Sequence, residues 1–169
     1  MPKITFKGNP MTLVGPELKV GDAAPDFTVV DNSLTPVNLA NYAGRIKIIS
    51  AVPSLDTPVC DTETRRFNQE AGGLPGDVAV LTISVDLPFA QKRWCGAAGI
   101  DRVVTLSDYR DRSFGLAYGV LIDELKLLSR SIFVVDRSDT ICYIQHVPEV
   151  TQEPDYAAVL AAVRQLLPR

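Results

Sequence analysis

The chain has 169 residues, of which 46% are hydrophobic and 22% are charged, the usage of a folded domain with one hydrophobic core. Seventeen basic and twenty acidic side chains give a net charge of −3, which argues against the basic surface that a nucleic acid requires. The longest apolar stretches, IKIISAV and VAVLTISV, are too short to span a bilayer, and the N-terminus lacks an apolar run of signal-peptide length. We therefore expect a single domain over residues 1–169 that binds neither membrane nor nucleic acid and stays in the cytoplasm.

The first elements are short strands. Residues 1–15 predict a β-hairpin, because alternating apolar residues flank a Gly-Asn-Pro turn signal. Residues 26–31 then predict a half-buried strand. The continuous apolar run at 45–52 suits a central strand that is covered on both faces.

Strands and helices alternate through the middle of the chain. The patterns predict a helix at 57–71, a strand at 77–86, a helix at 87–99, a strand at 103–108 and a short helix at 112–120. This is the rhythm of βαβ units, which place their strands side by side in parallel.

The C-terminal part follows another pattern. Two strands at 129–136 and 140–147 are joined by a polar turn and predict a β-hairpin, and a helix at 155–167 follows. A hairpin and a last helix added to βαβ units outline a thioredoxin-like domain. The sequence thus predicts an α/β chain with a thioredoxin-like fold: a mostly parallel central sheet, a C-terminal β-hairpin and an N-terminal β-hairpin extension.

Three cysteines, Cys60, Cys95 and Cys142, form no CxxC pair, and their odd number argues against a secreted disulfide framework. A metal site or a Cys/His dyad would have to rest on the single histidine, His146, so we expect neither a metal nor another cofactor. Cys142 alternates with apolar neighbours along a strand, which predicts a core cysteine. His146 reads as a strand-face residue and not as a catalytic base.

Cys60 lies where a strand ends and a helix begins. Thr57 suits the N-cap and Pro58 suits the first helical position, which puts Cys60 in the first turn. Free backbone N–H groups and the positive end of the helix dipole favour a thiolate there. Apolar neighbours would favour the thiol instead, so position alone leaves a reactive cysteine and a core cysteine as alternatives.

The spacing of Pro53, Thr57 and Cys60 resembles the PxxxTxxC pattern of the peroxiredoxins and, within them, of the bacterial thiol peroxidases. The segment SVDLPFAQKRWC at 84–95, the arginine of SRSIFVVD, the N-terminal hairpin and the phrase TQEPDYAAVLAAV are similar to that subfamily in the same order. The resemblance therefore covers nearly the whole chain.

The resemblance assigns a role to five residues. It implies that Cys60 is the peroxidatic cysteine and that Cys95 is the resolving cysteine. Thr57 would donate its hydroxyl to the leaving oxygen of the peroxide. Arg130 would present a fixed guanidinium group to the same oxygen, and Pro53 would shield the pocket from water. An arginine at the start of a buried strand needs a charged partner, and a thiolate is such a partner.

The implied activity is that of a thiol-dependent peroxidase for hydrogen peroxide and alkyl hydroperoxides. A sulfenic acid on Cys60 would be resolved by Cys95 as an intramolecular disulfide and recycled by thioredoxin. The family likeness also implies a homodimer.

Two other hypotheses for the function remain. A thiol–disulfide oxidoreductase on the same fold is one, although Thr57 stands where its second cysteine would be. A non-catalytic redox sensor that uses a Cys60/Cys95 switch is the other. We expect the two arginines of the predicted helix at 57–71, Arg65 and Arg66, to be mainly surface charges.

Overall fold

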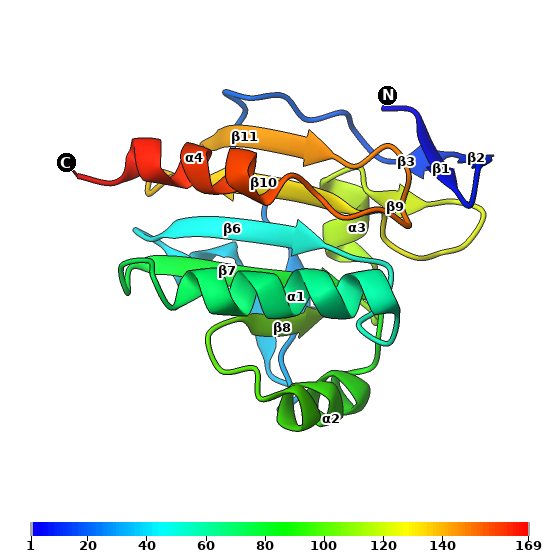
Figure 1. The fold of residues 1–169 in the computed structure, drawn as a ribbon. Helices are drawn as coiled ribbons and strands as arrows, with labels where there is room; N and C mark the ends of the chain where they lie inside the picture. The colour runs from blue at the N-terminus through cyan, green and yellow to red at the C-terminus, as the bar shows by residue number, and fades with distance from the viewer. Residues whose placement is uncertain (1, 169) are drawn as a thin grey trace.

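Within residues 2–168, the part of the chain that the computed structural model describes, seven strands form the main sheet (Figure 1). In order across the sheet these are β11 (Ile141–His146), β10 (Ser131–Val135), β6 (Ile46–Ala51), β7 (Val78–Ser84), β8 (Val104–Ser107), β4 (Thr28–Val30) and β5 (Pro36–Asn38). The middle strands β6, β7 and β8 run parallel, and the strands on either side pair antiparallel. The thioredoxin-like fold with its parallel centre and C-terminal hairpin is thus confirmed.

The two innermost strands are buried at every position, as their apolar runs predict. One charged side chain lies among them. Lys47 of β6 is fully buried, and its ammonium group donates to Asp139 Oδ1 at 2.6 Å. The parallel centre of the sheet is therefore a rigid support for the loops at its carboxyl edge.

Helices cover both faces of the sheet. On the face nearest the viewer in Figure 1 lie α1 (Pro58–Ala71) and α4 (Tyr156–Leu166), which pack against the strands through Phe67, Val159 and Val163. The short α3 (Ser113–Ala117) packs on the opposite core, and α2 (Pro88–Ala98) packs against β8. A 3₁₀ turn, η1 (Leu39–Tyr42), follows β5. None of the helices within residues 2–168 is long and apolar enough to cross a bilayer.

The N-terminal hairpin forms as expected, from β1 (Ile4–Phe6) and β2 (Asn9–Met11). Its turn differs from the expected Gly-Asn-Pro: Lys7 and Gly8, with φ of 51° and 80°, make the bend, and the asparagine and proline lie in β2. Two successive residues with positive φ are what a tight type I′ hairpin turn requires.

The hairpin is docked on the rest of the molecule. Thr5 exchanges backbone hydrogen bonds with Pro148 and Val150, and Ile4 packs with Ile122 and Val150. The next strand, β3 (Leu13–Val14), pairs with β9 (Leu121–Ile122). These contacts bring the hairpin to the same edge of the sheet as the start of α1.

Candidate active site

Cys60 is the third residue of α1 and is fully buried. Pro58 occupies the first helical position and Thr57 the N-cap position, as the sequence predicts. The Thr57 side chain does not cap the helix, however: its hydroxyl donates to the Ser54 carbonyl at 2.8 Å. The first-turn N–H groups around Cys60 therefore receive no side-chain cap.

Arg130 precedes β10 and is 2% exposed. Its Nη2 donates to Cys60 Sγ at 3.2 Å, its Nη1 to Glu63 Oε2 at 2.5 Å and its Nε to the Val150 carbonyl at 2.8 Å. The guanidinium is thus fixed from three directions beside the sulfur. The structure brings together Cys60 and Arg130, which are 70 residues apart in the sequence.

Glu63 is a site residue that was not predicted from the sequence. It lies one turn after Cys60, is fully buried, and accepts a second hydrogen bond from the Ser50 hydroxyl at 3.2 Å. Burial raises the pKa of Glu63, and the Arg130 charge opposes that rise. The sequence signal that could have identified Glu63 is an acidic residue three positions after Cys60, on the same face of the helix.

The same contacts keep the arginine charged. Burial by itself would lower the pKa of Arg130, but the carboxylate of Glu63 and the sulfur of Cys60 outweigh burial and raise it. A permanent positive charge therefore lies against the sulfur in a dry environment, where electrostatic interactions are strong.

A cavity of 340 Å³ opens beside this cluster. Pro53, Thr57 and Arg130, the three residues that the sequence assigned to the pocket, all line it. Phe6 and Lys7 of the N-terminal hairpin also line the cavity, and they were not predicted from the sequence as site residues. The remaining lining residues are Pro58, Val59, Val150 and Thr151. Arg130 lines the cavity and also contacts the sulfur, which puts the cavity next to Cys60.

Cys95 does not contact Cys60. It is the eighth residue of α2, and its Sγ lies 3.4 Å from Thr105 Oγ1 on β8. Trp94 packs against the small cluster of Val52, Leu55 and Cys60 instead. All three cysteines of the chain are free thiols.

The other residues that the sequence singled out lie away from the sulfur. Cys142 sits at the far end of β11, where burial and the neighbouring Asp136 carboxylate raise its pKa. His146 is held by the Ser131 hydroxyl at 2.8 Å, and burial lowers its pKa. The two exposed arginines of α1 form ion pairs along the helix, with Asp61 for Arg65 and Glu70 for Arg66.

Residues 19–160 match the family described as Redoxin. The thiol peroxidase of Halalkalibacterium halodurans is 57% identical over 99% of this chain and 100% of its own length. The thiol peroxidase of Bacillus subtilis is 59% identical over 99% of each chain. The crystal structure of a peroxiredoxin-like protein from Aquifex aeolicus, 44% identical, superposes with a TM-score of 0.93 over 99% of this chain and 98% of the other.

Identity at this level extends from the N-terminal hairpin to the last helix, and therefore includes the segments that carry the buried cysteine, its arginine and the second cysteine. A shared fold alone would not require it. The chain belongs to the redoxin family and, within it, to the thiol peroxidases.

Proposed function

We propose that this protein is a thiol-dependent peroxidase that reduces hydrogen peroxide and alkyl hydroperoxides. The observation that carries the proposal is the guanidinium of Arg130, held 3.2 Å from Cys60 Sγ at the wall of a mostly apolar cavity. A fixed cation beside a buried thiol favours the thiolate, which is the nucleophilic form of cysteine.

In the first step the Cys60 thiolate attacks the nearer peroxide oxygen and the O–O bond breaks. The sulfur becomes a sulfenic acid, and the departing oxygen leaves as water or an alcohol once it is protonated. Within the described residues, Arg130 uses three of its five N–H groups on Cys60, Glu63 and Val150. The remaining N–H groups can stabilise negative charge on the leaving oxygen.

Thr57 and Pro53 contribute to the same step from the cavity wall. The Thr57 hydroxyl donates to the Ser54 carbonyl, so it must turn from that carbonyl to donate to a peroxide. Pro53 is buried and has no N–H group, so it adds an apolar wall that excludes water. An apolar wall also suits the carbon chain of an alkyl hydroperoxide.

In the second step Cys95 resolves the sulfenic acid. The Cys95 thiolate attacks Cys60 sulfur, an S–S bond replaces the S–O bond, and water leaves. A thioredoxin-type dithiol then reduces the disulfide by exchange and restores both thiols. The protein as described is in the dithiol state, the state that reacts with peroxide.

One assay separates this function from its two rivals. Purified protein is mixed with peroxide, thioredoxin, thioredoxin reductase and NADPH, and NADPH oxidation is followed. Sustained turnover is the expected result. Reduction of insulin disulfides without peroxide turnover would support the oxidoreductase, and rapid oxidation of Cys60 without turnover would support the sensor.

We further propose that residues 1–169 act as a single cytoplasmic domain and work as a homodimer. The family likeness supports the dimer, and an odd number of cysteines without a CxxC pair suits a reducing compartment. Sedimentation equilibrium tests the dimer directly, and a monomeric mass at micromolar concentration would reject it.

A further inference from the structure

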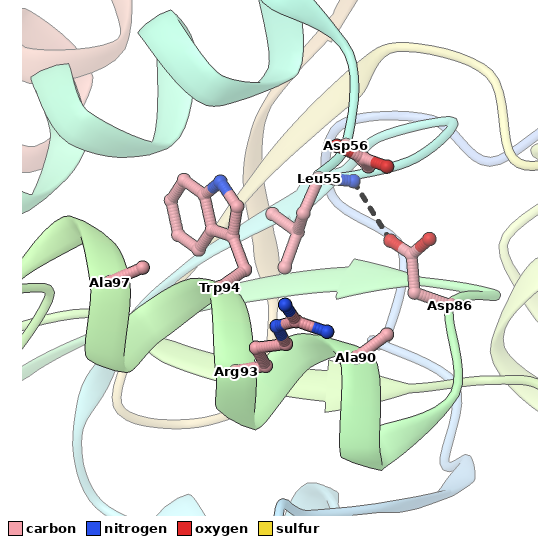
Figure 2. A pocket seen from close by; sticks show the side chains of 7 residues that line it. All are labelled: Leu55, Asp56, Asp86, Ala90, Arg93, Trp94 and Ala97. Atoms are coloured by element: carbon pink, nitrogen blue, oxygen red, sulfur yellow. Dashed lines mark hydrogen bonds between the residues drawn. The ribbon is translucent and has the colours of Figure 1, made fainter.

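Asp86 lies between β7 and α2 and connects them to the loop that carries Cys60. Its Oδ1 accepts from the Ser54 hydroxyl at 2.6 Å, and its Oδ2 accepts from the Leu55 N–H at 2.8 Å and the Ser84 hydroxyl at 2.7 Å. Figure 2 shows the Leu55 bond reaching across from the Cys60 loop to the start of α2. Both carboxylate oxygens are therefore engaged, one of them twice.

The connection continues into α2. Ser84 Oγ accepts a hydrogen bond from Gln91 Nε2 at 3.0 Å, and Gln91 is fully buried on the inner face of α2. A continuous set of polar contacts thus runs from Ser54 through Asp86 and Ser84 to Gln91. It joins the loop before Cys60 to the helix that carries Cys95.

Outside these polar contacts, the loop and α2 meet where Trp94 packs against Leu55. A cavity of 460 Å³ lies between them, with Asp86 at one end and Trp94 and Ala97 toward the other (Figure 2). Its lining residues are Leu55, Asp56, Asp86, Ala90, Arg93, Trp94 and Ala97. The hydrogen bonds to Asp86 are therefore the polar part of the hold between loop and helix, beside the packing of Trp94 on Leu55.

We propose that Asp86 is a positioning residue that latches the Cys60 loop to α2, and that the latch must release before Cys95 can reach Cys60. The inference rests on the proposed function, because it concerns the step in which the Cys95 thiol and the Cys60 sulfenic acid give a disulfide and water. Closed, the latch keeps the Cys60 loop in place for peroxide. Open, it lets the two cysteines approach.

Asp86→Asn weakens the latch with a minimal change of shape. With its oxygen on Leu55 and Ser84, an amide presents its NH₂ group to Ser54, whose hydroxyl must then accept, and all three bonds lose their charged acceptor. Losing a hydrogen bond to a charged acceptor shifts the balance between closed and open forms by about tenfold or more. The closed form stays dominant, so the peroxide step is nearly unchanged, whereas disulfide formation through the minor open form becomes about tenfold faster.

The experiment follows both steps in one protein by stopped flow, with one equivalent of hydrogen peroxide and no reductant. Trp94 is the only tryptophan of the chain and packs on the Cys60 cluster, so its fluorescence reports the reaction. A Cys95→Ser background isolates the first phase. Mass spectrometry of Cys60 sulfinic acid gives a second readout: the peroxide concentration that overoxidises half of the protein rises about tenfold with the faster resolution.

Asp56→Asn is the matched control. Asp56 is exposed, lines the same cavity and undergoes the same loss of one charge, but its carboxylate is not part of the latch. Wild-type rates for both phases are expected. Ser54→Ala removes one donor to Asp86 without altering charge, and faster disulfide formation is expected there too.

The outcomes separate the two proposals. Wild type that forms no Cys60–Cys95 disulfide would reject the proposed function. Wild type that forms the disulfide, while Asp86→Asn and Ser54→Ala form it no faster, would reject the latch. If Asp86→Asn fails to fold, as judged by its thermal unfolding, Ser54→Ala decides alone.

Discussion

The buried Arg130 cation needs partners of its own, and it has two, the Glu63 carboxylate and the Cys60 sulfur. Cys60, Arg130 and Glu63 form this set, all of them within 2% exposure. Leaving one charge of such a set unpaired is costly, which fixes the geometry of the other two. We therefore expect Glu63 to hold Arg130 in place beside the sulfur and not to touch the peroxide.

Removing that hold is expected to slow the peroxide step, though less than removing the cation itself. Arg130→Met loses the donor and should reduce the second-order rate of Cys60 oxidation by about 10²-fold or more. Glu63→Gln keeps the shape but frees the guanidinium, and a loss of about tenfold or more is expected. The double variant should lose no more than Arg130→Met, because both changes disable one unit. Additive losses by stopped-flow fluorescence would assign Glu63 a separate role.

The three cysteines differ in what surrounds them. Cys60 has a helix start and a guanidinium, whereas Cys142 lies beside the Asp136 carboxylate, which disfavours its thiolate. Cys60→Ser should abolish peroxide reduction and Cys142→Ser should leave it intact, as measured by NADPH-coupled turnover. Comparable losses in the two variants would show that the wrong sulfur has been assigned.

At the residue scale, Pro53, Thr57 and Cys60 were predicted from a motif with fixed spacing, and Arg130 from the family resemblance of the segment SRSIFVVD. Glu63 was not predicted, since its partner is 67 residues away and only the folded helix face reveals the pair. Cys95 came from the resemblance, and in the dithiol structure its sulfur contacts Thr105 instead of Cys60.

Among the elements, the N-terminal hairpin contributes residues to the cavity beside Arg130, although its strands are short. Its turn residue Lys7 and the preceding Phe6 line the cavity beside Arg130. Glu149 holds the hairpin there: one oxygen accepts from Gly8 N–H at 2.8 Å and Thr5 hydroxyl at 3.0 Å, and the other from Thr151. The sequence predicted the hairpin but not its docking, because the contacts join segments 141 to 144 residues apart.

These bonds make the docking of the hairpin depend on pH. The Thr151 hydroxyl and N–H, with the Gly8 N–H, lower the pKa of Glu149 from an ordinary 4.5 to about 2. A folded-state pKa below the unfolded one means that the stabilisation is complete above about pH 4.5 and is lost as pH falls through about 2. Amide exchange at residues 4–11 should therefore accelerate, relative to the sheet, between those two values.

Glu149→Gln provides the control for this titration. The variant should show faster exchange at residues 4–11 already at pH 7, with no further change in that acid window. The Km for a bulky alkyl hydroperoxide should rise in the variant, because the hairpin lines the cavity. A hairpin that stays protected in Glu149→Gln would show that its apolar contacts suffice.

For the whole molecule, the parallel centre of the sheet decides what the second step requires. β6 and β7 are parallel, so the helices that follow them, α1 and α2, start at the same edge of the sheet. Cys60 is the third residue of its helix and Cys95 the eighth, a stagger of about 7.5 Å along the helix axes before any sideways separation is counted. A disulfide tolerates Cα atoms about 7 Å apart at most, so the dithiol fold cannot close the bond as it stands.

Local unwinding is therefore the remaining route, and the fold limits where it can occur. The central strands are buried throughout and too costly to open, whereas the first turn of α1 and the end of α2, with Gly96 and Gly99, are cheap. We expect faster amide exchange at residues 56–64 or 90–100 in the disulfide form, with exchange in β6 and β7 unchanged. Peroxide-treated Cys95→Ser, which cannot form the bond, should keep the pattern of the dithiol protein. Equal exchange in the dithiol and disulfide forms would mean that Cys60 and Cys95 do not pair within one chain, since no rigid arrangement of α1 and α2 brings them together.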